Sequence, residues 1–389
     1  MTTDSNSPIT APPPAPPLVP EVARTPVRRA GPSRWTAFGN GVGIEIRDKD
    51  LQVTIVRVRP SETGVLGAAT VTDYRTRPAA EWGTELLGFF RKVGAGHIAA
   101  TVLLPRRDVI VRTLHLPGVQ DNDLESAVSL QMDSLHPFTD EDVCFSWARL
   151  GKTPYVLIGL ARRQVVDTYS SLFAEAGLKI VSFTFSAAAI YSALRIITTP
   201  PPGFVIAHKL DNGFELYGES EARPVYSATL PTTRERALEI ASSELRLDPR
   251  TEPAGLHDLL PKPSLYPADY DPQSPVFGTN ALTYAAALAG ACPWLGIEGN
   301  VLPAELRRGS SRVRLIPTIT LAVILAALLI VLGVESSWFD SRYLAVLQHQ
   351  IALSEPAAKR VDVIDRAVAA TRARSQSLDD FKRRPRLDM

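Results

Sequence analysis

The feature that most constrains this chain is an apolar run near its C-terminal end. Residues 315–334 read LIPTITLAVILAALLIVLGV, without a charged residue. At about 1.5 Å per residue, a helix of about 20 residues spans the roughly 30 Å hydrocarbon core of a bilayer. A buried core helix would show polar residues at a period of about 3.6, whereas this run is apolar on all sides. The sequence therefore predicts one transmembrane helix over residues 315–334.

The residues that flank this run predict its orientation. Four arginines lie within the eight residues that precede it, whereas Glu335 and Trp338 follow it. Positive charge stays on the cytoplasmic side, and tryptophan favours the membrane interface. We therefore expect a cytoplasmic N-terminus and a C-terminus on the opposite side of the membrane.

The composition excludes several classes of function. The chain has 42 basic and 41 acidic residues and a net charge of +1. A nucleic-acid-binding protein would carry a strong basic excess, so no nucleic-acid partner is expected. Cys144 and Cys292 lie far apart, which is typical of reduced core thiols. The six histidines have no second ligand at metal spacing, so we expect no metal site.

Residues 1–34 form a proline-rich segment that includes APPPAPPLVPEVARTPVRRAGP. It has no apolar centre of the kind that a signal peptide requires. Such a composition favours extended conformations and buries too little surface to fold. We expect a disordered arm here. The alternative is a docking site for a partner that recognises proline.

Strand and helix patterns alternate in two groups between the arm and the apolar run. The first group opens with a predicted hairpin, residues 42–46 and 51–58, and the second with a hairpin around the turn Asp211-Asn212-Gly213. Further strands are expected at residues 98–104, 109–116, 155–160 and 180–185, and helices at residues 81–92, 163–175, 187–196, 232–245 and 282–291. This order predicts an α/β fold with two related halves and mixed sheets.

Four stretches in this order carry a resemblance: VGIEIRDKDLQVTIV, TVLLPRRDVIVRTLHLP, DLESAVSLQMDSLHPFTDED and YVLIGLARRQVVDTYSSLFAEAGLKIVSFTFSAAAIYSAL. They are similar to the type IV pilus assembly protein PilM, which has the actin-like ATPase fold. Farther along, NVLPAE at residues 300–305 looks like the motif that opens the pilus protein PilN. The chain resembles a PilM–PilN fusion, an arrangement also seen in the secretion protein GspL, over roughly residues 38–380.

The resemblance implies five parts and a location in the bacterial inner membrane. They are the arm, an actin-like (ribonuclease H-like) two-lobed cytoplasmic domain over residues 35–298, a PilN-like peptide and linker over residues 299–314, the transmembrane helix over residues 315–334, and a periplasmic helical tail over residues 335–389. PilN-like proteins continue into a folded periplasmic domain, for which this sequence leaves no room. Either the reading frame is truncated or the protein relies wholly on helix pairing.

Actin-like enzymes hold phosphates with two hairpin turns, each typically containing Asp-x-Gly. Here the first turn reads Glu45-Ile46-Arg47 and the second His208-Lys209-Leu210, with Asp211 following. Glu45 could face a magnesium ion and Arg47 a phosphate, but a long side chain keeps the backbone away from the phosphate. We interpret Glu45 and Asp211 as solvated turn carboxylates.

The glycine-rich adenosine loop of the family is also replaced, by the proline-rich residues 261–275. We therefore expect no catalytic turnover of ATP, and neither ATP nor magnesium as a cofactor. The chain is predicted not to be an enzyme.

Two segments are predicted to bind partners. The PilN opening peptide binds in a groove of PilM, so Asn300, Val301, Leu302 and Pro303 are expected to dock on their own chain, where a short tether raises the effective concentration. The alternative is an ordinary linker. Beyond the membrane, the spacing of apolar residues on either side of Pro356 is typical of a coiled-coil helix, or else of a solvated amphipathic one. These residues are Leu344, Leu347, Ile351, Val361, Ile364 and Val368.

The function that these features favour is a non-enzymatic scaffold in the inner-membrane platform of a type IV pilus or type II secretion system. It would link a cytoplasmic motor to periplasmic partners. Expected partners are a motor ATPase, a polytopic PilC-like protein and a PilO-like coiled-coil protein, in a homo- or hetero-oligomer. The alternatives are a nucleotide-binding actin-like ATPase and a single-pass membrane regulator.

Overall fold

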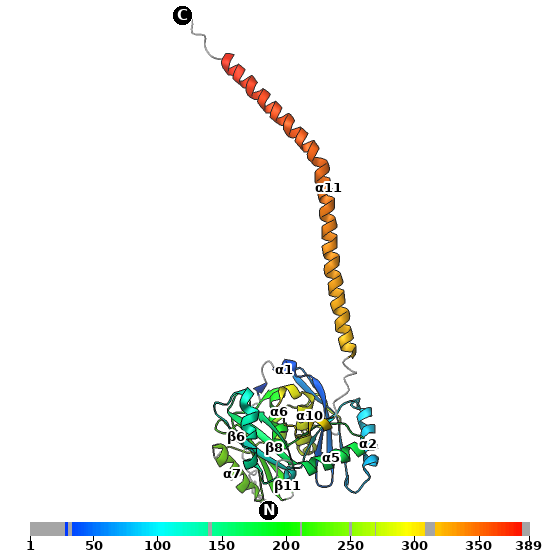
Figure 1. Cartoon of the computed structure of the whole chain (residues 1–389), viewed down its shortest axis with the longest axis vertical. Helices are drawn as coiled ribbons and strands as arrows, with labels where there is room; N and C mark the ends of the chain where they lie inside the picture. Colours follow the sequence, from blue (N-terminus) through cyan, green and yellow to red (C-terminus); the bar gives the residue numbers. More distant parts are fainter. Residues whose placement is uncertain are drawn as a thin grey trace, which may run out of the picture. The chain divides into compact units, whose positions relative to one another are not determined.

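The computed structural model describes residues 28–29, 33–138, 142–210, 212–248, 251–268, 270–307 and 316–382. The chain divides into two compact units, residues 1–311 and residues 312–389 (Figure 1). Most of the proline-rich arm lies outside the described residues. Its end does not: β1 (Arg28–Arg29) pairs with β10 (Thr198–Thr199), and α1 (Ser33–Thr36) follows. The disorder predicted up to residue 34 is therefore wrong for these positions.

The central element of the first unit is a mixed five-stranded sheet with the order β4-β3-β2-β5-β9. β2, β3 and β4 form an antiparallel meander, and β5 and β9 continue the sheet in parallel with β2. The strands are β2 (Gly39–Ile46), β3 (Leu51–Arg59), β4 (Glu62–Val71), β5 (Ala100–Leu103) and β9 (Ile180–Thr184). The hairpin predicted at residues 42–58 is thereby confirmed.

Helix α10 (Ala281–Ala291) packs closely against β2, and small residues make this possible. Gly39, Gly41 and Gly43 alternate along the face of β2 that meets this helix. A Cβ atom at Gly41 would lie 2.1 Å from the carbonyl oxygen of Ala287. The alanine-rich composition of α10 is therefore explained by close helix–sheet packing, in which no larger side chain has space.

Two smaller antiparallel sheets flank the large one. One has the order β6-β8-β7 and packs on two short helices, and the other has the order β11-β12-β13 and packs on α7. The elements of the first are β6 (Val109–His115), β7 (Val143–Arg149), β8 (Tyr155–Arg162), α3 (Leu124–Ser129) and α4 (Met132–Leu135). Those of the second are β11 (Phe204–Leu210), β12 (Gly213–Glu219), β13 (Tyr226–Leu230) and α7 (Arg234–Leu245).

The α/β class and the second hairpin are confirmed, but the two halves are less alike than expected. Over the described residues, the second half has only the antiparallel sheet β11-β12-β13, without parallel strands like β5 and β9. The mixed sheet predicted for that half is wrong. The remaining helices are α2 (Ala79–Lys92), α5 (Arg163–Glu175), α6 (Ser186–Ile196), α8 (Leu256–Leu259) and α9 (Pro275–Thr279). Cys144 and Cys292 are both buried and free.

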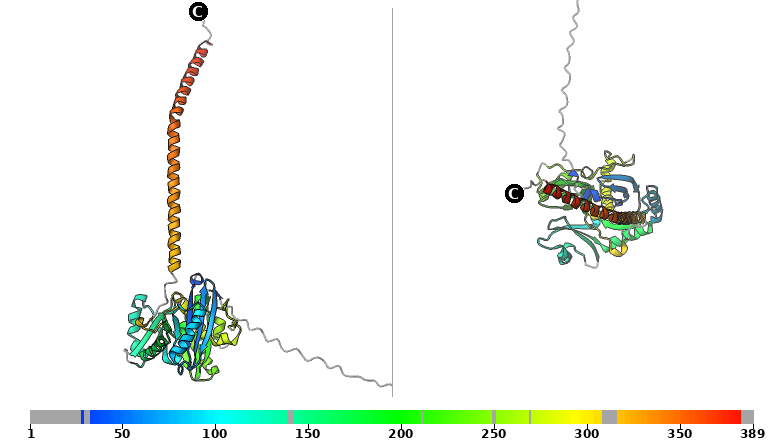
Figure 2. Two further views of the ribbon diagram at one scale, coloured as in Figure 1. Left: turned by 90° about the vertical axis from the view of Figure 1, so that its right-hand side faces the viewer. Right: turned by 90° about the horizontal axis from the view of Figure 1, so that it is seen from above.

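The second unit consists of the helix α11 (Ile316–Lys382). It continues through Pro356, so this residue does not divide the tail into two helices. The helix bends along its length (Figure 2), and a proline inside a helix causes such bends because it removes one backbone hydrogen bond. Among the residues that the structure describes, no helix meets the length and apolarity of a membrane span.

Candidate functional site

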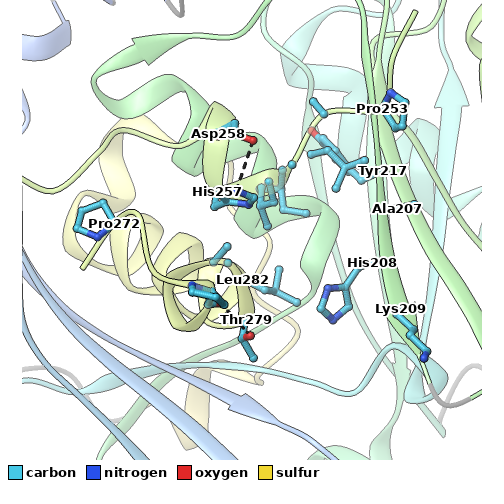
Figure 3. A pocket seen from close by; sticks show the side chains of 18 of the residues that line it. Ala207, His208, Lys209, Tyr217, Pro253, His257, Asp258, Pro272, Thr279 and Leu282 are labelled. Carbon is cyan, nitrogen blue, oxygen red and sulfur yellow. Dashed lines mark hydrogen bonds and ion pairs between the residues drawn. The ribbon is translucent and has the colours of Figure 1, made fainter. Parts of the chain in front are cut away.

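A cavity of about 1130 Å³ lies between the sheet β11-β12-β13 and the helices α8 to α10. In Figure 3, His208 and Lys209 of β11 lie on one side of it, and Thr279 and Leu282 on the other. His208 and Lys209 belong to the second turn that the resemblance assigns to phosphate binding. The cavity is therefore the place at which an actin-like nucleotide site would be expected.

The first turn is closed by contacts within the chain. Glu45 is only 7% exposed, and its carboxylate accepts hydrogen bonds from Thr283 Oγ1 at 2.9 Å and from Arg47 Nη2 at 3.0 Å. Arg47 Nη2 also donates to the backbone oxygen of Thr279 at 2.8 Å. The interpretation of Glu45 as a solvated carboxylate is wrong, because α10 brings Thr283 against it. Both charged groups of this turn are already paired.

A second buried carboxylate, Glu215 on β12, lines the cavity. It accepts a hydrogen bond from Ser186 Oγ at the start of α6, and Arg106 Nε lies 3.3 Å from its Oε1. Burial raises the pKa of Glu215, while Arg106 opposes this increase; burial in turn lowers the pKa of Arg106. The pair is therefore a desolvated ion pair that joins β12 to the segment after β5.

Glu219, on the same face of β12, forms a second link to α6. Arg195 binds both of its carboxylate oxygens, and Tyr217 donates a hydrogen bond to Oε1. The Arg195 guanidinium also lies 3.5 Å from the centre of the Tyr191 ring. Burial, the largest single effect, would lower the pKa of Arg195, but the hydrogen bonds that Arg195 donates to Glu219 and the negative charge of Glu219 together raise this pKa. These contacts fix β12 against α6 below the cavity.

Acidic and basic side chains both lie around this region, since Lys209, Arg234 and Lys262 line the cavity together with Glu215. Glu45 lies close enough to Glu215 to raise its pKa further, so two carboxylates lie near the expected phosphate position. Arg47 and Arg106, the cations beside them, are engaged with these carboxylates. Among the described residues, no group of three or more His, Cys, Asp or Glu side chains is placed to hold a metal ion. Asp211 lies outside the described residues.

The proline-rich segment that replaces the adenosine loop forms another wall of the cavity. Pro263, Tyr266 and Pro272 line it. The segment is attached to β4, since the backbone of Ser264 donates to Thr63 O at 2.7 Å and Leu265 O accepts from Val65 N at 2.7 Å. The wall is therefore part of the folded sheet edge.

Residues 300–302, predicted to dock on their own chain, lie against β9. Val301 N donates to Phe183 O at 2.9 Å, Asn300 Oδ1 accepts from Phe183 N at 3.1 Å, and Asn300 Nδ2 donates to Val181 O at 3.2 Å. Val301 and Leu302 are each 2% exposed and belong to the main core. Pro303 follows at the surface, half-buried. The segment is thus packed as an extension of the sheet edge, and its role toward a partner stays a prediction.

The six apolar residues predicted for helix pairing lie on α11, and all are exposed in the described structure. They are Leu344, Leu347, Ile351, Val361, Ile364 and Val368. Whether they pair with another helix stays a prediction.

Sequence reasoning missed the buried ionic residues. Glu215, Tyr217 and Glu219 alternate along β12 and therefore share one face, which was a usable signal. Arg106, Ser186 and Arg195 gave no such signal, because their partners lie on distant parts of the chain.

The match to a protein family agrees with this fold. Residues 44–202 match the family of the type IV pilus assembly protein PilM. The predicted resemblance to PilM is thereby confirmed for this segment, which contains β3 to β9 and the helices α2 to α6. Comparison with curated proteins gave no match.

Solved structures similar to this chain include a PilM complex. The PilM–PilN type IV pilus biogenesis complex has 18% identity and a TM-score of 0.40, over 54% of this chain and 66% of the other, slightly less than two thirds of it. The cytoplasmic domain of EpsL, an inner membrane component of the type II secretion system of Vibrio cholerae, has 14% identity and a TM-score of 0.42, over 69% and 99%. A Bacteroides thetaiotaomicron protein with an actin-like ATPase fold and unknown function has 11% identity and a TM-score of 0.34, over 64% and 97%.

Proposed function

We propose that this protein is a non-enzymatic scaffold in the inner-membrane assembly platform of a type IV pilus or type II secretion system. The observation that carries the proposal is the PilM family match over residues 44–202. A PilN-like peptide follows on the same chain and is packed against β9. One polypeptide would then combine the roles of PilM and PilN and link a cytoplasmic motor to periplasmic partners.

The non-enzymatic part of the proposal is supported by the paired charges of the first turn and of β12. Glu45 and Glu215 are buried, and Arg47 and Arg106 beside them are paired with them. A phosphate placed beside Glu45 and Glu215 would add negative charge next to two buried carboxylates, which is costly.

The membrane part of the proposal is supported by the sequence of residues 315–334, which has no charged residue. The test uses two introduced cysteines in whole cells, Ala373→Cys in α11 and Glu221→Cys in the folded unit, because Cys144 and Cys292 are buried. A maleimide that cannot cross membranes should label Ala373→Cys but not Glu221→Cys. Labelling of both or of neither in intact cells would contradict the single-pass orientation.

The scaffold role is tested by mass spectrometry of what co-purifies with the tagged, detergent-solubilised full chain from its own cells. Recovery of a motor ATPase, a polytopic platform protein and a PilO-like coiled-coil protein would support the scaffold. Recovery of a kinase or a sigma factor in their place would favour a single-pass regulator and leave the PilM match as a statement on fold.

A nucleotide-binding function is the second candidate, and the volume of the cavity, about 1130 Å³, is what favours it. Calorimetric titration of the full chain with magnesium-ATP distinguishes the two. The scaffold proposal expects no binding at micromolar concentrations. Micromolar binding that is lost in Lys209→Glu, a change in the cavity wall, would overturn the non-enzymatic proposal.

A further inference from the structure

We infer that residues 357–382 of α11 pair with the same residues of a second copy of this chain, in a parallel and in-register coiled coil. The inference names one partner of the proposed scaffold and rests on that proposal for its role in the cell. Its physical basis is the distribution of apolar and charged residues on α11.

The apolar residues after Pro356 define a heptad frame. With Val361 at position a, the core positions a and d are Val361, Ile364, Val368, Thr371, Ser375 and Leu378. The frame set by Leu344 and Ile351 would instead place Asp365 and Arg372 in the core. The stripe formed by positions a and d, called the seam below, therefore changes its heptad frame near Pro356. The residues that follow Pro356 form a separate pairing segment.

Charged side chains on the outer face of this segment form ion pairs with one another. Glu355 and Lys359 form an ion pair at 2.7 Å, and Asp362 and Arg366 form another at 2.5 Å. In the frame above, these residues occupy positions b and f, which point away from a partner helix. Such pairs four residues apart stabilise an isolated helix.

Three of the charges beside the seam have no such partner, whereas Asp379 at position e has Lys382 three residues away. Arg360 and Arg374 occupy position g, and Asp365 occupies position e. None of them has an opposite charge three or four residues away in the sequence. Over the described part of the chain, none of the three makes an ion pair. The helix thus pairs its outer charges internally and leaves these three seam charges for another chain.

A parallel in-register pair of these helices matches those charges. Position g of one chain lies beside position e of the next heptad of the other chain. Arg360 then meets Asp365 of the second copy, and Arg374 meets Asp379 of the second copy, each twice by symmetry. Arg372 at position e meets Ala367 of the second copy, a contact that neither favours nor opposes pairing. An antiparallel pair would bring g to g and e to e, so arginine would face arginine and aspartate would face aspartate.

Disulfide cross-linking of the purified full chain in detergent tests the register. Ile364→Cys and Leu378→Cys place a cysteine at position d, and Ala373→Cys, at position f, is the matched control. We expect oxidation to give dimers for both d-position variants and at least fivefold less for the control. Cross-linking only between Ile364→Cys and Leu378→Cys in a mixture would indicate an antiparallel pair and overturn the inference, as would equal yields for all three variants.

Charge reversal tests the partner. Arg360→Glu should weaken dimerisation about fivefold to tenfold, measured as the dissociation constant by sedimentation equilibrium in detergent. Adding Asp365→Arg to that variant should restore it, and the outer-face control Ala373→Glu, which has no charged residue three or four positions away, should leave it unchanged. An unchanged constant in Arg360→Glu, or no recovery in the double variant, would overturn the inference. The purified sample contains no other pilus or secretion protein. A negative result would therefore contradict the homodimer alone and leave the scaffold proposal unaffected.

Discussion

The folded unit over residues 33–307 and the helix α11 differ in where their side chains find partners. In the folded unit, buried charges such as Glu45 and Glu215 are paired within the chain, and the peptide at residues 300–302 is hydrogen-bonded to β9. In α11, apolar side chains such as Leu344 and Ile364 are exposed. The contrast is that the folded unit pairs these buried charges within the chain, whereas the helix leaves apolar side chains exposed.

The largest effect is expected for Leu302→Asp. This side chain is 2% exposed in the main core, and a buried carboxylate there should lower the free energy of unfolding by about 3–5 kcal/mol. Denaturant unfolding of the full chain, together with proteolysis near residues 295–307, measures this. The control Leu306→Asp, at a site 42% exposed, should change the stability by less than about 0.5 kcal/mol. If Leu302→Asp behaved like this control, residues 300–302 would be a linker and the comparison would fail.

Arg106→Met should destabilise the folded unit by about 2–4 kcal/mol at pH 8, because it leaves the Glu215 carboxylate buried without its cation. The loss should shrink toward pH 5. Burial raises the pKa of Glu215 in the folded state, and without Arg106 this pKa rises further. The contribution of Glu215 to the free energy of unfolding is therefore fully present below the ordinary glutamate pKa. It is lost as the pH rises through the raised pKa of the folded state.

The matched control for that change is Arg107→Met. Arg107 pairs with Asp48 at the surface, so its removal should have a small effect that varies little between pH 5 and pH 8. Thermal unfolding at both pH values measures the difference. A loss in Arg106→Met that is equal at the two pH values would mean that Glu215 does not titrate in this range.

Asn300→Ala should cost about 1–2 kcal/mol, because the amides of Phe183 and Leu302 lose their acceptor and Val181 O loses its donor. Hydrogen exchange at the Phe183 amide should become faster. Asn122→Ala, at an exposed site, serves as the control and should leave this amide unchanged. Unchanged exchange in Asn300→Ala would show that Val301 alone holds the segment.

The smallest effect on the folded unit is expected for Ile364→Asp. Ile364 is exposed on α11, so the unfolding transition of residues 33–307 should stay within about 0.5 kcal/mol. The same change should abolish pairing of the helix, read as the loss of dimer in sedimentation. If the folded unit itself became less stable, the two units would not be independent and the contrast between them would be wrong.

Local patterns predicted much of the fold. The hairpins of β2–β3 and β11–β12 and the helix α5 were found where alternation or helical spacing was strong. The strands β4, β7 and β13 were not predicted. β4 reads ETGVLGAATV, and its glycines and alanines carry little strand signal without the neighbouring strand to pack on.

The site was less predictable, for a physical reason. The burial of Glu45 depends on Thr283, which is 238 residues away in the sequence, and that of Glu215 depends on Arg106. Ion pairs of this kind arise from how sheets and helices pack, and spacing along the chain does not encode them. The departures from Asp-x-Gly at the two turns were visible in the sequence, but the contacts that pair Glu45 and Glu215 were not.

In the described part of the chain, a loop covers part of each edge strand of the five-stranded sheet. Residues 264–265 hydrogen-bond along β4, and residues 300–301 do the same along β9. Uncovered edge strands invite other chains to add strands, which leads to aggregation or to fibre-like growth. The covered part of each edge is therefore closed to strand addition by another chain. Where copies of this domain lie close together, these two loops restrict fusion of one sheet with the next.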